Sequence, residues 1–466
     1  MYKAYITMLT NVRKHPNADR LLLADVFGNT VCVSTDYAEG EIGVYFPTDG
    51  QLSVEFAERN NLLRKKDDAG NNIGGYMDPD KRNVTAIRLR GEKSDGLFLP
   101  LGCLAYTGVN LDTLNVGDVI DGTVNGHDIC QKYIPRTNHR QGHVTDGNKT
   151  RKHKVPTAPL FAEHADTEQL AYNLGAFKAG DEIEITLKMH GTSQRTGYLP
   201  VLKGYKRTLL DRLLRREGKP IYDYGYVSGT RRVVLENYEG GFYGDNIFRE
   251  QHSKIFEGKL NKGETVYYEV VGFTTSGQPI MASASNAKLQ DKAFVKQYGA
   301  ETVFSYGCHP NGWNAEDGGY NSGRNEPQSD IYVYRMTMTS EDGFVVEYTP
   351  DFMRYRCEQM GVKTVPVFAH MKLQEDGGFV FHKDGTYSAV AESDLGKFVM
   401  VAAEEYYDGP DPVGKTHVRE GVVVRIINRP KFAAYKHKNF SFKVLEGIAK
   451  VEAEAPDMEE AQDVTE

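Results

Sequence analysis

The sequence is poor in cysteine and tryptophan, and it has no long hydrophobic run. Its five cysteines are scattered over 466 residues and no two of them form a CxxC pair. This spacing excludes a cysteine-based zinc framework, and the odd number indicates a reducing compartment. No apolar stretch approaches the roughly 18 residues of a membrane-spanning helix, and the N-terminus lacks the apolar core of a signal peptide. We therefore expect a cytoplasmic protein without a membrane contact.

An excess of positive charge is also missing, because the formal net charge is -8. The tail 451–466 is rich in acidic residues, and we expect it to be disordered. Two segments, 136–154 and 203–219, are basic instead. A local basic patch can hold a phosphate backbone on an acidic protein, although a solvated linker and a solvated helix face explain the same residues equally well.

The chain divides into two parts by its pattern of short hydrophobic runs. Residues 1–125 contain short β-type runs separated by Gly, Asn and Asp, which predict a small β-barrel. Residues 126–159 form a polar, basic linker. Residues 160–450 mix β-type runs with helical stretches, which predicts an α+β domain whose antiparallel sheets flank a cleft. Within it, 273–328 is rich in Gly, Asn and Ser and is expected to be a long insertion or surface loop.

Charged residues stand in or beside several apolar runs of the second part. Lys188 follows the alternating run DEIEITL and precedes His-Gly-Thr-Ser, where Gly191 lets the backbone approach a ligand. Glu269 lies in YYEVVG and Glu420 directly before three valines, where a carboxylate is unfavourable unless it is paired. FSFKV is read as a further strand, with Lys443 between aromatic and aliphatic neighbours.

The order of these segments resembles that of the covalent nucleotidyltransferases, which include ligases and mRNA capping enzymes. The similar segments are KMHG (188–191), SGTRRV (228–233), YYEVVG (267–272), IYVYRM (331–336), EGVVVR (420–425) and FKVLE (442–446). The superfamily has KxDG as its first motif. Histidine in the third position resembles instead the RNA ligase 2 group and the RNA-editing ligases, whose motif is KxHGT. The resemblance covers about 160–450.

This resemblance implies a role for each matching residue. Lys188 is the nucleophile that takes AMP, and His190 helps to hold the adenylated state. The remaining roles are phosphate contact by Arg231 or its neighbour Arg232, recognition of a ribose hydroxyl by Glu269, adenine stacking between Tyr334 and Val423, a divalent metal held by Glu420, and contact with the α-phosphate by Lys443. Lys436 and Lys438 are alternatives to Lys443, which we prefer for its spacing after Glu420.

The chemistry explains why such residues are needed together. An ordinary lysine amine has a pKa of about 10.4 and is protonated at pH 7, so a nucleophilic lysine needs a nearby cation or partial desolvation. Lys443 and a bound metal would supply that positive field. Carboxylate oxygens are the ligands that Mg²⁺ prefers.

A second resemblance lies near the N-terminus. HPNADRLLLADV (15–26) and IRLRGEKSDGLFLPL (87–101) resemble the two ends of the tRNA-binding OB domain appended to some tRNA synthetases. The first part is therefore expected to be an OB-like barrel. It either binds RNA or is a structural barrel only.

Taken together, the resemblances imply an ATP-dependent RNA ligase that uses Mg²⁺ or Mn²⁺. It would join a 3′-OH end to a 5′-phosphate end through lysyl-AMP and an adenylated RNA end. The expected partner is RNA, either tRNA-like or a nicked duplex, and the protein is expected to be a monomer. The alternatives are a DNA ligase, a capping-type nucleotidyltransferase, or a non-catalytic RNA-binding protein with a decayed ligase domain.

Overall fold

The computed structural model describes most of the chain. The described residues are 2–27, 29–48, 50–66, 72–133, 156–165, 167–208, 218–235, 237–238, 243, 246–314, 325–374, 378–381, 387–390, 395–447 and 449–450. Much of the expected linker and the whole acidic tail lie outside these residues.

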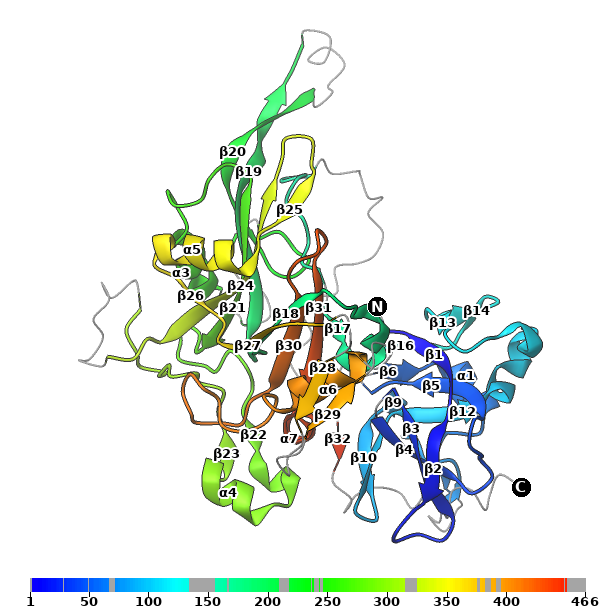
Figure 1. Cartoon of the computed structure of the whole chain (residues 1–466). Coiled ribbons are helices and arrows are strands. Elements are labelled where there is room, and N and C mark those ends of the chain that lie inside the picture. The colour runs from blue at the N-terminus through cyan, green and yellow to red at the C-terminus, as the bar shows by residue number, and fades with distance from the viewer. Residues whose placement is uncertain are drawn as a thin grey trace. The chain divides into compact units, whose positions relative to one another are not determined.

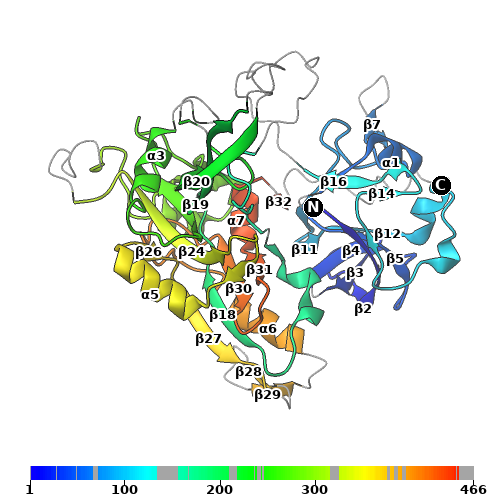
Figure 2. The same cartoon turned by 90° about the horizontal axis from the view of Figure 1, so that it is seen from above.

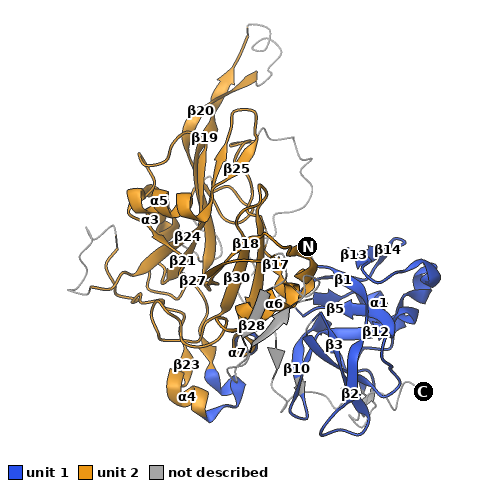
Figure 3. Cartoon of the chain, viewed as in Figure 1, with its two compact units in different colours: residues 1–142, 286–292, 443–466 blue, residues 143–285, 293–442 orange. Residues whose placement is uncertain are grey.

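The chain forms two compact units (Figure 3). The first comprises residues 1–142, 286–292 and 443–466, and the second comprises 143–285 and 293–442.

The first unit is built mainly of short strands. They are β1 (Ala4–Met8), β2 (Thr10–Lys14), β3 (Leu21–Val26), β4 (Asn29–Ser34), β5 (Ile42–Phe46), β6 (Gly50–Leu52), β7 (Lys65–Lys66), β8 (Asn72–Gly74), β9 (Asn83–Val84), β10 (Ala86–Leu89), β11 (Glu92–Asp95), β12 (Leu97–Pro100), β13 (Val119–Ile120), β14 (Thr123–Val124), β15 (His127–Asp128), β16 (Cys130–Lys132) and β32 (Ala449–Lys450). The helix α1 (Val54–Arg59) packs on the same core. β15 and β16 fall where the linker was expected to begin.

The strands of the first unit form separate small sheets. The orders are β12-β5-β1-β13, β2-β3-β4, β16-β6-β9 and β11-β10-β32, and these sheets include antiparallel hairpins. The strand-rich character expected from the sequence is confirmed, whereas the described residues form no single closed barrel.

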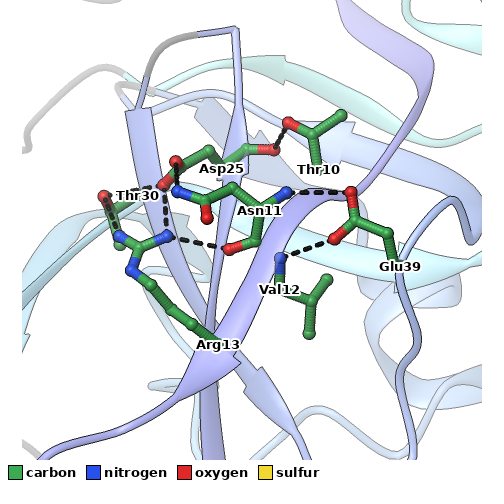
Figure 4. A network of polar contacts seen from close by, with 7 residues as sticks. All are labelled: Thr10, Asn11, Val12, Arg13, Asp25, Thr30 and Glu39. Carbon is green, nitrogen blue, oxygen red and sulfur yellow. Dashed lines mark hydrogen bonds and ion pairs between the residues drawn. The ribbon is translucent and has the colours of Figure 1, made fainter.

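A network of polar contacts fixes the irregular start of β2 (Figure 4). Asn11 has a positive φ of 52° at the shift in register between β2 and β3. The Glu39 carboxylate accepts the backbone N–H groups of Asn11 and Val12 at 3.0 and 2.7 Å. Asp25 accepts from the Asn11 side chain at 2.7 Å and from Arg13 at 3.0 Å. These bonds compensate for the ladder bonds that the bulge interrupts.

The two N-terminal segments that resemble an OB domain lie side by side. The His15 ring is 3.2 Å from the Leu89 carbonyl through Nε2, and the Asn17 side chain donates to the Arg90 carbonyl at 2.8 Å. The segments are 74 residues apart in the sequence, so the structure brings both ends of the pattern together.

The second unit contains two larger sheets (Figures 1 and 2). The five-stranded sheet has the order β17 (Glu168–Gln169), β31 (Ala433–Lys438), β30 (Gly421–Ile426), β18 (Glu182–Leu187), β27 (Val367–Lys372). The other has the order β20 (Lys219–Gly229), β19 (Thr192–Lys206), β21 (Glu264–Gly272), β24 (Ser329–Thr339), β25 (Val345–Glu347), with β26 (Lys363–Thr364) beside β24. Most pairs are antiparallel. The predicted α+β fold is confirmed.

Helices cover one face of each sheet. α6 (Leu395–Glu404) packs on the five-stranded sheet, and α3 (Ile247–Lys254) and α5 (Pro350–Met360) share the core of the other sheet. α5 begins with a Thr349 cap and ends at Gly361 with a φ of 70°, a common pair of helix signals. None of the helices in the described part of the chain combines the length and the apolar character of a membrane crossing.

The second unit also contains small elements outside the two sheets. They are β22 (Ala284–Ser285), β23 (Glu301–Thr302), β28 (Gly378–Phe381), β29 (Tyr387–Val390) and, at the border of the units, α4 (Lys292–Tyr298) and α7 (Phe440–Leu445).

The prediction of a strand at FSFKV is wrong, because these residues lie in α7. The Asn439 side chain accepts the N–H of Ser441 at 2.7 Å and that of Phe442 at 3.4 Å, which caps the start of the helix. About half of the basic segment 203–219, residues 209–217, lies outside the described residues.

Candidate active site

The alternation of side chains along β18 directs polar residues toward a pocket between the two sheets. Ile183 and Ile185 belong to the core under α6. Glu184 and Thr186, the residues of opposite parity, line the pocket, as do Leu187, Lys188 and Met189 at and beyond the end of the strand. Glu269 and Tyr334 of one sheet, Val423 of the other and Arg231 in the loop after β20 also line it. All of its lining residues belong to the second unit.

Lys188 shares one buried carboxylate with a second lysine. Its Nζ lies 2.6 Å from Oε1 of Glu420, which is 1% exposed. Nζ of Lys438 lies 3.1 Å from the same oxygen. Oε2 of Glu420 has no hydrogen-bond partner among the described residues, and Nδ1 of His190 is 3.8 Å from it. The two lysines therefore share one carboxylate oxygen.

Burial and charge act in opposite directions on the two carboxylates. Burial alone would raise the pKa of Glu420, but the charges of Lys188, Lys438 and His190 outweigh it and hold that pKa at about 2. For Glu269, burial dominates and raises the pKa to about 7, against the attraction of Lys188. Glu420 is thus an anion over the whole physiological range, whereas Glu269 gains or loses its proton near neutral pH.

Two glycines are required by close backbone approaches. A Cβ on Gly191 would lie 2.4 Å from the Val270 carbonyl oxygen and 2.8 Å from Cγ of Glu269. Gly421 has a φ of 147°, and a Cβ there would lie 2.1 Å from the His437 carbonyl oxygen. The Lys188 amide donates to the Gly421 carbonyl at 3.0 Å. These contacts fix the backbone at Gly191, which follows Lys188, and at Gly421, which bonds to the Lys188 amide.

Two phenylalanine rings and one tyrosine hydroxyl hold His190. The His190 ring lies edge-on to Phe304 and Phe442, with centroid distances of 4.6 and 4.8 Å. The backbone N–H of His190 donates to the Tyr306 hydroxyl at 2.7 Å. Tyr306 is 2% exposed and packs on His417 at 4.6 Å. Tyr306 therefore immobilises the backbone two residues beyond Lys188.

Tyr334 and Val423 approach the pocket from different sheets. Tyr334 is in β24 and Val423 is in β30. The Tyr334 hydroxyl is 2.8 Å from the Ser193 hydroxyl, and its ring lies 5.2 Å from the ring of His164. An aromatic face and an aliphatic side chain thus border one space.

The pocket includes Arg231, whereas Arg232 is not among its lining residues. Arg195, 1% exposed, donates to the carbonyl groups of Thr230 and Arg231. The guanidinium of Arg195 also lies over the Phe161 ring, 4.4 Å from its centroid. This buried arginine holds the loop that presents Arg231.

Lys443 does not line the pocket. Its Nζ lies 3.6 Å from Oδ1 of Asp95, a buried residue of the same compact unit. The structure brings Lys438 to Glu420 instead. Lys436 and Lys438 have the same parity in β31 as Ala434, which lines the pocket. The structure thus favours this strand over α7 as the source of the last lysine.

The sequence interpretation did not single out Tyr306, Phe304 or Arg195. The first two belong to the segment 273–328, which was expected to be a surface loop, although both are buried. Aromatic residues within this Gly-rich segment were the one signal in the sequence for Phe304 and Tyr306.

Several solved structures resemble the chain over nearly its whole length. Naegleria gruberi RNA ligase with PPi is 16% identical, covers 94% of this chain and 97% of its own, and has a TM-score of 0.55. A mutant of that ligase with AMP and Mn is 17% identical, with coverages of 95% and 98% and a TM-score of 0.55. A further mutant with ATP and Mn is 17% identical, with coverages of 96% and 99% and the same TM-score.

The chain has the RNA ligase nucleotidyltransferase fold. The expectation drawn from the order of the sequence motifs is thereby confirmed for the fold. The sequence matches no family model and no curated protein.

Proposed function

We propose that the protein is an ATP-dependent RNA ligase that works through a lysyl-AMP intermediate on Lys188. The observation that carries the proposal is the position of Lys188, which lines a pocket with Glu269, Tyr334 and Val423 and whose amine lies 2.6 Å from buried Glu420. The similar structures are of an RNA ligase with ATP, AMP, PPi and Mn, which supports the same substrate class here.

In the first step, the uncharged amine of Lys188 attacks the α-phosphorus of ATP. A nitrogen–phosphorus bond forms, the bond to the leaving pyrophosphate breaks, and the proton of the amine passes to water. Tyr334 and Val423 hold the adenine between them, Glu269 accepts a hydrogen bond from a ribose hydroxyl, and Arg231 contacts a phosphate. These groups position the nucleotide, which supplies much of the acceleration in phosphoryl-type transfer.

Two cations share one carboxylate beside the attacking amine. Lys438 partly neutralises the Glu420 charge that also faces Lys188. When phosphates enter, Lys438 is close enough to the site to compensate their charge. We therefore assign the α-phosphate contact to Lys438 in place of Lys443.

Glu420 offers one buried carboxylate oxygen to a divalent metal. Oε2 of Glu420 is buried without a hydrogen-bond partner among the described residues, and a carboxylate oxygen of this kind suits Mg²⁺ or Mn²⁺. When bound there, the ion neutralises charge on the phosphates. Glu420 is the residue that would hold it.

In the later steps, AMP passes from Lys188 to the 5′-phosphate of RNA, giving a 5′–5′ phosphoanhydride. A 3′-OH then attacks the RNA phosphorus, a phosphodiester forms, and AMP leaves. The overall reaction joins two RNA ends and converts ATP into AMP and pyrophosphate.

Incubation with α-labelled ATP and Mg²⁺ tests the first step directly. We expect one AMP on the peptide containing Lys188 and none on the Lys188→Ala variant. Lys296→Ala, which changes an exposed lysine in α4, is the matched control and keeps the label. Wild-type protein without label, or label on Lys188→Ala, would falsify the proposal.

Nicked RNA compared with nicked DNA then tests the substrate. Joining of the RNA nick alone supports the RNA ligase, whereas joining of the DNA nick alone identifies a DNA ligase. Label from GTP in place of ATP would identify a capping-type activity.

A further inference from the structure

The β19–β20 hairpin continues beyond the sheet to which it belongs. β21 pairs with β19 only along residues 192–197, whereas β20 stays paired with β19 as far as Lys206. Residues 198–206 and 219–226 therefore form a two-stranded extension, here called the arm, which projects from the sheet in Figure 1. At about 3.3 Å per residue the arm is roughly 25 Å long. Residues 156–161 contact one part of the arm, where the Leu202 amide donates to the Thr157 carbonyl at 2.8 Å and Leu199 packs with Phe161.

Positive charge is concentrated on this arm. The described residues 198–208 and 218–226 contain four lysines and arginines against one acidic residue, Asp223, in a chain with a net charge of -8. Lys203, Lys206, Arg207 and Lys219 are exposed. Lys206 and Lys219 are direct cross-strand partners. Like charges in that position destabilise a strand pair, and a polyanion bound across them removes the repulsion.

A row of tyrosines follows one face of the arm. Tyr222, Tyr224 and Tyr226 are two residues apart in β20, and the register places Tyr198 and Tyr205 on the same face. The rings of Tyr198 and Tyr226 stack at 4.7 Å at the base. All five tyrosines are partly exposed. Ring faces at such intervals are a platform on which successive bases stack.

Protection of a sheet edge explains only part of this pattern. Lysines on an edge strand prevent pairing with another chain. Partly exposed aromatic rings do not serve that purpose, because they favour association. An acidic protein would use the lysines but not the row of rings. Alternation places Lys206 and Lys219 on the face opposite the tyrosines, whereas Lys262 lies over the Tyr224 ring, 4.9 Å from its centroid. Exposed rings on one face and cations on the other suit a single strand of nucleic acid that crosses the edge of the arm.

We infer that the arm is a binding surface for single-stranded RNA, which holds the strand whose end is joined at Lys188. The inference rests on the proposed function for the identity of the nucleic acid. The lysines contact the phosphate backbone without reading sequence, and the tyrosines stack on bases.

Binding of a fluorescein-labelled single-stranded RNA of about 20 nucleotides to the full chain, followed by anisotropy at several salt concentrations, tests the inference. In Lys206→Glu/Lys219→Glu we expect roughly tenfold weaker binding near 0.1 M salt, and a logarithmic salt slope reduced by about 1.4. Lys296→Glu/Lys372→Glu carries the same change of charge on exposed lysines elsewhere in the second unit, and keeps the affinity and slope of the wild type.

A second variant separates stacking from charge. Tyr205→Leu/Tyr222→Leu keeps every charge, so we expect weaker binding of RNA but unchanged binding of inorganic polyphosphate. Unchanged RNA affinity in both arm variants would overturn the inference. Competition by polyglutamate as effective as that by RNA would also overturn it, in favour of an acidic protein partner. Labelling of the wild type by ATP is scored separately, so failure of the proposed function is recognised independently of the arm.

Discussion

Replacement of Lys438 tests the arrangement in which two lysines share the Glu420 carboxylate. The pKa of Glu420 is about 2, against an ordinary value of 4.5, so its cationic neighbours stabilise the anion by about 3 kcal/mol net of burial. Lys188, Lys438 and His190 share this effect, and Lys438 accounts for roughly 1 to 1.5 kcal/mol if the shares are similar. Without Lys438, the carboxylate attracts the Lys188 ammonium more strongly.

We therefore expect Lys438→Met to slow AMP transfer to Lys188 about tenfold at pH 7, since 1.4 kcal/mol is a factor of ten. Methionine keeps the aliphatic stem near the Phe442 ring, over which the Lys438 amine lies at 6.0 Å. The measurement is the single-turnover rate of protein labelling at saturating ATP across a range of pH. The rate should stay below that of the wild type across this range, because Glu420 then pairs with Lys188 without Lys438.

Lys443→Met is the matched control. Its amine pairs with Asp95 at 3.6 Å, and Lys93 also pairs with Asp95 at 2.7 Å. Loss of one partner of a buried carboxylate is expected to lower the unfolding temperature but to leave the pH profile of labelling in place. The reasoning is refuted if Lys438→Met is labelled as fast as the wild type while a folded Lys443→Met protein takes no label.

Three further predictions concern residues around Lys188. Tyr306→Phe loses the hydroxyl that accepts the hydrogen bond from the His190 amide, so we expect several-fold faster hydrogen exchange at that amide and several-fold slower labelling at saturating ATP. Tyr226→Phe loses an equivalent bond from the Gly258 amide and should leave labelling unchanged. Gly191→Ala places a Cβ 2.4 Å from a carbonyl oxygen, and we expect about 1–3 kcal/mol of destabilisation by thermal unfolding together with weaker ATP binding. The pKa of Glu269 is about 7 in the folded chain, against 4.5 in the unfolded chain, so wild-type stability falls as the pH rises from 4.5 to 7. Glu269→Gln does not titrate. We therefore expect its free energy of unfolding, relative to wild type, to be higher by up to about 3 kcal/mol at pH 8 than at pH 4.

The fold was predictable because its signals are local. DEIEITL alternates with period two and becomes β18, and the Thr-Pro start and Gly end of α5 are standard helix boundaries. The register between strands was not predictable in this way. The separate small sheets of the first unit depend on pairings such as that of β1 with β13, more than 100 residues away in the sequence.

Much of the candidate site followed from the motif order for the same reason. Lys188, His190 and Gly191 are adjacent in sequence, and Glu269, Tyr334 and Val423 lie in strands whose parity fixes the direction of each side chain. Tyr306 has no such relation to Lys188. It reaches the His190 amide across 116 residues from a segment without regular structure, so no periodicity could indicate its position.

The choice between Lys438 and Lys443 shows how a wrong prediction of local structure changes the proposal for the chemistry. In a strand, Lys443 would share a face with Ser441 and Leu445, and its spacing after Glu420 made it the preferred residue. Asn439 instead caps a helix, so the strand β31 ends at Lys438 and the direction of every later side chain follows a period of 3.6. The capping signal was present in KNFS, but the alternating aromatic residues after it favoured a strand. Because the register places Lys438 opposite Gly421, next to Glu420, the end of the strand determines which lysine meets the carboxylate.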